Sequence, residues 1–194
     1  TPPSDAWAQQ VTIVADWPNG YPFDTAADSI AAGIPSGLTK NRISIASTPD
    51  AANAIVNSFN NGSLLTNYIG HGSVEIWSNA TFSSGTALSL ANGNRLPFVV
   101  AMNCLNGYYH DLFTLSLAEA LLKNPDGGAI GVWASSALSG TSGQLAVNLE
   151  FTRQVFGSTP TTIGDAILRA KQASSNSDVR RTWILFGDPT MKLK

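Results

Sequence analysis

The chain has 194 residues, enough for one domain with helices on both sides of a sheet, and 43% of them are hydrophobic, as in globular proteins. Only 12% are charged, about half the usual share, and the formal net charge of -2 excludes the basic field that nucleic-acid binding requires. No apolar run approaches the roughly 18 residues that a membrane span needs, so no transmembrane segment is predicted.

The start of the chain and its single cysteine bear on where the protein works. The chain begins at Thr1 and shows neither an initiator Met nor a signal-peptide pattern. We therefore expect residues 1–194 to be a single domain or subdomain, excised from a longer protein. Cys104 is the only cysteine, which excludes an internal disulfide. The charge-poor surface, rich in Ser, Thr and Asn, favours a secreted or cell-surface protein; the oligomeric state is not predicted.

Strand and helix signals alternate in the first half of the chain. Short apolar runs at 11–15 and 42–46 predict buried strands, with a helix expected over about 25–34 between them. Thr48 and Pro49 are residue types typical of an N-cap and a first helical position. The helix that follows is amphipathic, because its apolar residues recur at helical spacing: Ala52, Ile55, Val56 and Phe59.

The second half continues this alternation. Apolar runs predict strands at 64–70, 96–103 and 129–134, and a last strand at 190–193. Helices are expected from an N-cap at Asp111 to residue 123, over 143–156, and over 162–171, where Thr162 and Asp165 have the spacing of a capping box. A helix-like segment is expected at 178–186. Strands separated by amphipathic helices predict crossover connections, hence a three-layer α/β sandwich with a mainly parallel sheet and helices on both faces.

Two of the predicted strands end in residues that can carry out acyl transfer. The strand at 64–70 is followed by His71, and the strand at 96–103 is followed by Cys104. Binding crevices in an open parallel sheet form at the carboxyl ends of its strands. We therefore expect the imidazole and the thiol to share one edge of the sheet.

Acyl transfer requires a nucleophile, a proton carrier and two amide donors. Cys104, as thiolate, would be the nucleophile, and His71 would protonate the departing amine and later activate water. The main-chain N–H groups of Gly72 and Cys104 can point at a developing oxyanion. A second interpretation stays open at this point. A cysteine after an apolar run can simply fill the core, and a lone histidine in a glycine-rich turn can be a surface residue.

Three motifs occur in order along the chain: Gly70-His71-Gly72-Ser73 with Trp77 four residues on, Asn103-Cys104-Leu105-Asn106-Gly107, and Phe186-Gly187-Asp188-Pro189. In this combination the chain resembles the gingipain family of cysteine peptidases, part of the wider caspase-like group. The resemblance implies a caspase-like fold and thiol-dependent hydrolysis of peptide bonds in a polypeptide substrate. It also implies His71 and Cys104 as the catalytic pair, with the Gly72 and Cys104 amides as the oxyanion site.

The resemblance implies roles for three more side chains. Asp16 is similar in position to an acid that orients the histidine, which in the family is Glu; the alternative is a turn-forming Asp before Trp17. Asp24 lies where basic-specific members place a carboxylate at the floor of the pocket for the residue before the scissile bond. It is equally a candidate helix N-cap. Trp77 is a further candidate for substrate binding.

The resemblance also bears on cofactors and on the whole protein. The family's catalytic region carries another α/β subdomain upstream, which we expect to be missing from this chain. No cofactor is required for the chemistry. Structural Ca²⁺, which family members can bind, could take oxygens from Asp16, Asn19 and Asp24, although no dedicated Ca²⁺ loop is present. We expect His110 to be structural. Two other functions stay open: a non-catalytic caspase-like scaffold in a secreted adhesion or assembly protein, and a transpeptidase using the same pair.

Overall fold

A six-stranded sheet forms the centre of the computed structural model, which describes residues 5–159 and 161–193. The strand order is β2-β1-β3-β4-β5-β6. The first five strands are parallel and β6 is antiparallel to β5. The strands are β1 (Gln10–Ala15), β2 (Thr39–Ser44), β3 (Leu65–Ile69), β4 (Phe98–Met102), β5 (Gly131–Ser135) and β6 (Trp183–Phe186).

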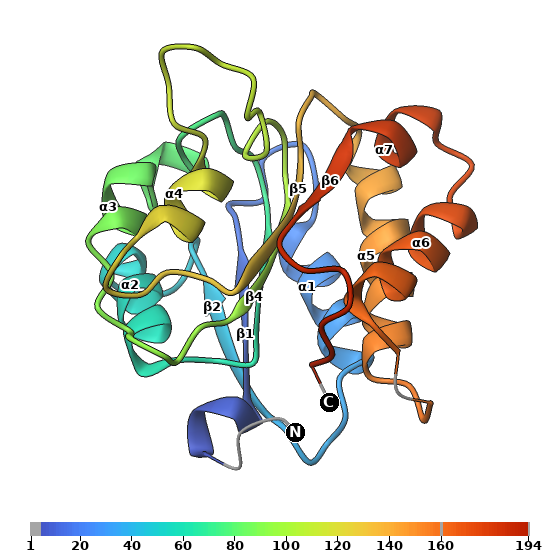
Figure 1. Cartoon of the computed structure of the whole chain (residues 1–194), viewed down its shortest axis with the longest axis horizontal. Helices are drawn as coiled ribbons and strands as arrows, with labels where there is room; N and C mark the ends of the chain where they lie inside the picture. The colour runs from blue at the N-terminus through green and yellow to red at the C-terminus, as the bar shows by residue number, and fades with distance from the viewer. Residues whose placement is uncertain (1–4, 160, 194) are drawn as a thin grey trace.

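Helices cover both faces of the sheet (Figure 1). On one face lie α1 (Phe23–Ala32), α5 (Thr141–Val155), α6 (Ile163–Ala173) and α7 (Ser177–Thr182). On the other lie α2 (Ala51–Asn61), α3 (Ser84–Leu88) and α4 (Leu117–Lys123). Two short 3-10 helices, η1 (Ala6–Gln9) and η2 (Ser78–Ala80), complete the elements. The predicted three-layer, mainly parallel architecture is confirmed. Among the described residues, no helix is long and apolar enough to cross a bilayer.

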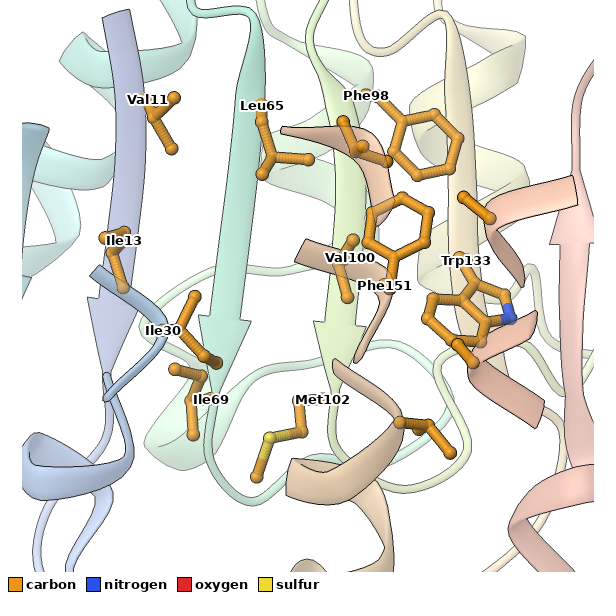
Figure 2. Packing of buried hydrophobic residues seen from close by; sticks show 14 of the residues in the cluster. Val11, Ile13, Ile30, Leu65, Ile69, Phe98, Val100, Met102, Trp133 and Phe151 are labelled. Carbon is orange, nitrogen blue, oxygen red and sulfur yellow. The ribbon is translucent and has the colours of Figure 1, made fainter. Parts of the chain in front are cut away.

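Alternate residues of the central strands feed two separate cores. Figure 2 shows the core on the side of α1 and α5, where Ile30 and Phe151 from these helices pack against side chains of the strands. These strand residues include Ile13, Leu65, Ile69, Phe98, Val100, Met102 and Trp133. Val14, Tyr68, Val99, Ala101 and Val132 enter the opposite cluster. Each large side chain buried in this way contributes about 1.5–3 kcal/mol. The two cores fix the strands, and thereby the residues at the strand ends.

Two predicted helix caps are wrong. The N-cap of α2 is Asp50, whose carboxylate accepts the Asn53 N–H. Thr48 lies in the turn before it, where its N–H donates to the Ser44 carbonyl. The helix α4 begins much later than Asp111. Ser116 caps it, in a capping box with Glu119. The Asp111 carboxylate instead accepts the N–H groups of residues 113 and 114 in the loop before it.

The end of the chain also differs from the prediction. Residues 183–186 leave the predicted helix and form β6, and residues 190–193 are not a strand. The edge of β5 offers unpaired main-chain groups, and Trp183 packs edge-on against Trp133 with ring centroids 4.7 Å apart. This tertiary pairing outweighs the local helical pattern. The Thr162 cap of α6 is as predicted, with its hydroxyl accepting the Asp165 N–H.

Candidate active site

Three functional candidates lie one or two residues after the ends of neighbouring strands. Asp16 follows β1, Gly70 and His71 follow β3, and Cys104 follows β4 by two residues. The main-chain ladder continues past the strands, because the Asp16 N–H donates to Ile69 O at 3.0 Å and the Gly70 N–H donates to Met102 O at 3.1 Å. His71 is exposed, Cys104 is partly exposed and Asp16 is fully buried. The structure therefore brings the three candidates to one edge of the sheet.

The loop after β1 holds His71 at both its main chain and its ring. One Asp16 carboxylate oxygen accepts the main-chain N–H of His71 at 2.9 Å, and the other accepts the Trp17 N–H at 2.7 Å. The imidazole Nε2 lies 3.1 Å from the Asn19 carbonyl oxygen, and the ring stands edge-on to Phe23 with centroids 5.1 Å apart. Asp16 thus binds the histidine backbone, while the observed partner of the ring is a main-chain carbonyl.

The Asn19 carbonyl decides which imidazole nitrogen carries the proton. A carbonyl oxygen can only accept, so Nε2 must be the protonated nitrogen in this contact. In the neutral ring, Nδ1 then keeps the lone pair. This tautomer leaves His71 with one nitrogen fixed by the protein and one free to take a proton.

Tyr68 supports the His71 turn from inside the sheet. Its hydroxyl donates to His71 O at 2.6 Å and accepts the Ser78 N–H at 3.2 Å. Burial, with a contribution from the Asp16 carboxylate, raises the pKa of Tyr68 well above its usual range, so the hydroxyl remains a donor. Gly70 has to be glycine at this point, because a Cβ would lie 2.4 Å from the Tyr68 hydroxyl oxygen and 2.5 Å from the Asp16 Cβ.

Cys104 lies against the loop that precedes α5. Its Sγ donates to Ser139 O at 3.6 Å. Gln144 is a fully buried residue in the first turns of α5, and its Nε2 lies within hydrogen-bonding distance of three acceptors: Ser139 O at 2.9 Å, Ser139 Oγ at 2.7 Å and Asn103 O at 3.3 Å. The two N–H groups of this amide are shared among them. One side chain therefore joins the residue before the thiol to the loop that faces the thiol.

The turn after Cys104 is strained and firmly bonded. Leu105 has a φ of +64°, a left-handed conformation that disfavours a branched side chain. Asn106 is fully buried and donates to Ser73 O at 2.6 Å and to Ile76 O at 3.3 Å, and its Oδ1 accepts from Asn103 Nδ2. These bonds tie the cysteine turn to the histidine turn. Strained residues held by their surroundings cluster at functional sites, which supports a role for this turn.

The two amides predicted for the oxyanion have no acceptor of their own. Among residues 5–159 and 161–193, the N–H groups of Gly72 and Cys104 donate to no other group. Gly72 lies close against Asn103, since a Cβ built on it would be 2.1 Å from Asn103 Nδ2. Unpaired donors beside a partly exposed thiol are what a developing oxyanion would need.

Comparison with known proteins places this arrangement in a family. The model of peptidase family C25 matches residues 1–194, the whole chain. The chain belongs to this family. Gingipain R2 and gingipain R1 of Porphyromonas gingivalis are each 30% identical to it over 155 residues, 72% of this chain. The chain spans only 21% and 15% of those two proteins.

Solved structures agree on the fold. A crystal structure of the Arg specific cysteine proteinase gingipain R matches with a TM-score of 0.85 and 24% identity, covering 97% of this chain and 48% of its own. A complex of the pro- and mature domains of Porphyromonas gingivalis RgpB matches with a TM-score of 0.83 and 23% identity, covering 96% and 49%. The caspase-like fold predicted for this C25 family member is therefore confirmed.

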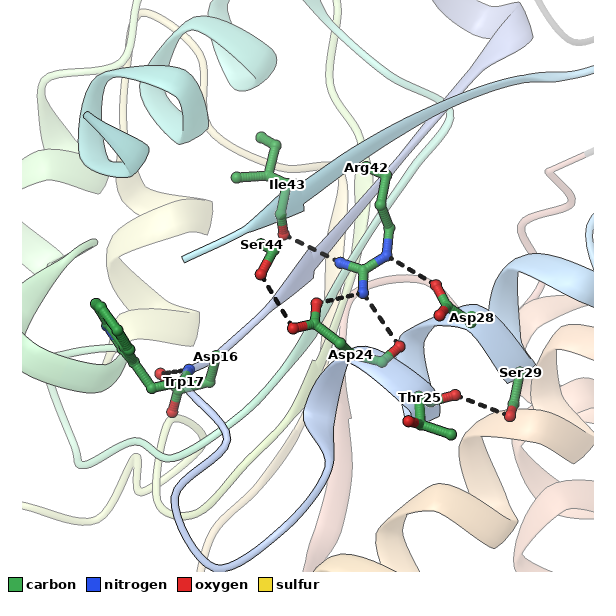
Figure 3. Close-up of polar contacts among 9 residues, drawn as sticks. All are labelled: Asp16, Trp17, Asp24, Thr25, Asp28, Ser29, Arg42, Ile43 and Ser44. Atoms are coloured by element: carbon green, nitrogen blue, oxygen red, sulfur yellow. Dashed lines mark hydrogen bonds and ion pairs between the residues drawn. The ribbon is translucent and has the colours of Figure 1, made fainter. Parts of the chain in front are cut away.

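Asp24 does not lie free at a pocket floor. Its carboxylate accepts from the Arg42 guanidinium at 2.7 Å and from the Ser44 hydroxyl at 3.1 Å, and Asp28 lies on the far side of the same guanidinium (Figure 3). Asp24 lies in the first turn of α1 but accepts no capping hydrogen bond there; the N-cap position is Pro22. The negative charge of Asp24 is thus already paired with Arg42 of β2. This pairing gives no support to the predicted pocket for a basic side chain.

Trp77, the second residue predicted to bind substrate, lies in the core. The ring is fully buried in the core beside α2 and α3, stacked on Tyr68 at 4.1 Å and packed against Phe59 and Phe82. A side chain buried among aromatic neighbours offers no surface to a substrate. The tryptophan after the histidine motif is therefore a structural residue of the site. His110 is exposed and lies against Tyr108 and Tyr109.

The residues suggested for calcium do not fit a shared ion. The Asp16 carboxylate binds two main-chain N–H groups and the Asp24 carboxylate binds Arg42, so the two are held by different partners (Figure 3). The Asn19 carbonyl oxygen is in contact with His71. Within the described part of the chain, no group of three or more His, Cys, Asp or Glu side chains is placed to hold a metal.

Several residues around the site were not predicted from the sequence. Tyr68 had a local signal, since it carries a hydroxyl within the predicted strand and lies three residues before His71. Gln144 also had one, because it is a polar residue three positions before Val147 on the buried face of α5. The Asn19 carbonyl had none, because a main-chain acceptor carries no residue type.

Proposed function

We propose that this chain is the catalytic subdomain of a cysteine endopeptidase that cleaves polypeptides through Cys104 and His71. One observation carries the proposal. An exposed imidazole and a partly exposed thiol follow adjacent strands, on turns tied by Asn106, and the N–H groups of Gly72 and Cys104 in these turns have no acceptor among the described residues. Membership of peptidase family C25 supports the reaction class.

The contacts of His71 support a route for the proton transfers. With Nε2–H donating to the Asn19 carbonyl, Nδ1 takes the Cys104 proton while Sγ attacks the scissile carbonyl carbon. The carbonyl electron pair moves to the oxygen, which the Gly72 and Cys104 N–H groups stabilise. When the C–N bond breaks, His71 returns the proton to the leaving amine and a thioester remains. His71 then deprotonates a water that attacks the thioester, and the thiol is released with its proton.

The contact with the Ser139 carbonyl supports a resting state in which Cys104 is a hydrogen-bonded thiol. A thiol that donates to this oxygen has its proton directed toward Ser139. Attack therefore requires rotation of the S–H bond away from Ser139 O before the proton moves to His71. Substrate binding next to Ser139 would favour that rotation.

The proposal extends to the protein of which this chain is a part. We infer that the complete protein is secreted or cell-surface, and that an upstream subdomain completes its catalytic region. The substrate is a polypeptide. Since Asp24 is paired with Arg42, its charge gives no reason to propose a preference for basic residues before the scissile bond.

Substitution of each candidate tests the proposal. Cys104→Ala should abolish both peptide hydrolysis and labelling by a thiol-directed inhibitor, while leaving the circular dichroism spectrum unchanged. His71→Ala should lose at least about 10²-fold in kcat, the usual contribution of a general acid–base. His110→Ala is the matched control, because it removes the only other histidine and should leave kcat close to that of the wild type. Hydrolysis that survives Cys104→Ala would refute the assignment.

A further inference from the structure

The two oxyanion amides belong to the peptide groups that join His71 to Gly72 and Asn103 to Cys104. In a planar trans peptide, the C=O and the N–H point in opposite directions. A hydrogen bond that fixes the carbonyl on one side therefore also fixes the direction of the N–H on the other. The question is which groups hold these two carbonyls.

The carbonyl before Cys104 is held by α5. Asn103 O accepts from Gln144 Nε2 at 3.3 Å, and no other donor reaches it among the described residues. Gln144 is fully buried, and its remaining bonds to Ser139 keep the amide group in place. The Cys104 N–H is left pointing away from α5, with no acceptor in the described chain.

The carbonyl before Gly72 is held from β3 and from η2. His71 O accepts from the Tyr68 hydroxyl at 2.6 Å and from the Ser78 N–H at 3.1 Å. Tyr68 itself is immobilised, because its fully buried ring stacks on Trp77 with the ring planes 5° apart. The Gly72 N–H therefore points in the opposite direction, away from the groups that hold the His71 carbonyl.

We propose that Tyr68 and Gln144 are positioning residues that aim the Gly72 and Cys104 N–H groups at the oxyanion. The inference rests on the proposed peptidase function. Neither side chain would touch the reacting atoms; each would act through a carbonyl. Without Tyr68, His71 O keeps the Ser78 N–H, whereas Asn103 O has Gln144 alone. Loss of Gln144 should therefore have the larger effect.

The test uses Gln144→Met and Tyr68→Phe, which keep the side-chain volume and remove the donor. Gln144→Met should lower kcat by roughly 10- to 100-fold, less than the 10²–10³-fold that deletion of an oxyanion donor costs, with KM within about twofold of the wild type. Tyr68→Phe should lower kcat by a smaller factor. Alkylation of Cys104 by iodoacetamide should keep its rate in both variants, because that reaction develops no oxyanion.

Asn148→Ala is the matched control. Asn148 lies one turn beyond Gln144 on the same buried face of α5, and its amide pairs with Asn67 instead of with the peptide group of Cys104. This variant should lower stability without lowering kcat. An unchanged kcat in Gln144→Met, or an equal loss in Asn148→Ala, would overturn the positioning role. Tyr68→Phe keeps the test open if Gln144→Met does not fold.

A spectroscopic measurement separates this inference from the proposed function. The main-chain ¹³C resonance of the Asn103 carbonyl should move upfield in Gln144→Met, and that of the His71 carbonyl in Tyr68→Phe, as each carbonyl loses a donor. Unchanged resonances would overturn the inference whatever the activity. A wild-type chain that gives the expected shifts on substitution but hydrolyses no peptide would overturn the proposed function instead.

Discussion

Replacement of Asp16 by Asn tests whether the carboxylate holds the main chain of His71 or orients its ring. Asn keeps one acceptor oxygen but turns an NH₂ group toward one of the two bonded N–H groups, which leaves a buried donor unpaired at a cost of about 1–3 kcal/mol. The remaining bond loses its charge assistance, roughly half its strength. Removal of a buried charge offsets part of this loss. The free energy of unfolding should therefore fall by about 1–3 kcal/mol.

The effect of Asp16→Asn on catalysis should be small by comparison. The carboxylate binds the main chain of His71, and the ring keeps its contact with the Asn19 carbonyl. We expect kcat to fall by about tenfold or less, far from the roughly 10⁴-fold loss seen when an acid that orients a catalytic imidazole is changed to its amide. Urea unfolding and peptide hydrolysis, measured well below the unfolding midpoint, give the two numbers.

Asp188→Asn is the control for loss of charge alone. Asp188 is exposed and its carboxylate accepts from the N–H and hydroxyl of Thr190, so the change should stay within about 0.5 kcal/mol with normal kcat. A 10⁴-fold loss of kcat in Asp16→Asn with unchanged stability would refute the main-chain role. It would show instead that the carboxylate orients the ring during catalysis.

Three further changes test other parts of the structure. Gly72→Ala places a Cβ 2.1 Å from Asn103 Nδ2 and should displace the histidine turn, lowering kcat about 10²-fold; wild-type kcat would contradict the packing. Arg42→Met should cost under about 1 kcal/mol in urea unfolding, since the pair with Asp24 is partly exposed, and should not change peptide preference; a new preference for Lys or Arg would restore the pocket role of Asp24. The raised pKa of Tyr68, caused first by burial, means that the folded chain holds a proton that the unfolded chain releases above about pH 10. The free energy of unfolding of the wild type relative to that of Tyr68→Phe should therefore be constant below that pH and fall above it. A difference that stays constant above that pH would contradict this.

Much of the architecture was predictable because local patterns and tertiary demands agree. The runs that end before Gly70 and Asn103 are fully buried because both faces of a covered parallel sheet are buried, and their largely apolar composition makes them recognisable in sequence. The glycine-flanked histidine and the single cysteine then mark the strand ends. Their presence at one edge of the sheet follows from parallel topology alone.

The parts that were not predictable depend on distant partners. Residues 183–186 follow a helical segment without a breaking residue, and they become a strand because β5 offers an open edge. Gln144 is conspicuous as a polar residue on an apolar helix face, yet its acceptor at Asn103 lies 41 positions away. Asp24 has an ordinary N-terminal position in its helix, and nothing local indicates that Arg42 from β2 will take its charge.

The polar residues buried at the carboxyl ends of these strands share one property, which is that they bond to the main chain around His71 and Cys104. Asp16, Tyr68, Asn106 and Gln144 each bond to main-chain atoms of the histidine or cysteine turns or of the loop that faces the thiol. Within the described residues, Asn103 Oδ1 and Gln144 Oε1 are buried without a partner, at about 1–3 kcal/mol for each such group. A fold gains no stability from unpaired buried oxygens beside a left-handed Leu105. Under the proposed function this backbone is shaped for the direction of two N–H groups, and we expect the positions most sensitive to substitution to extend well beyond His71 and Cys104.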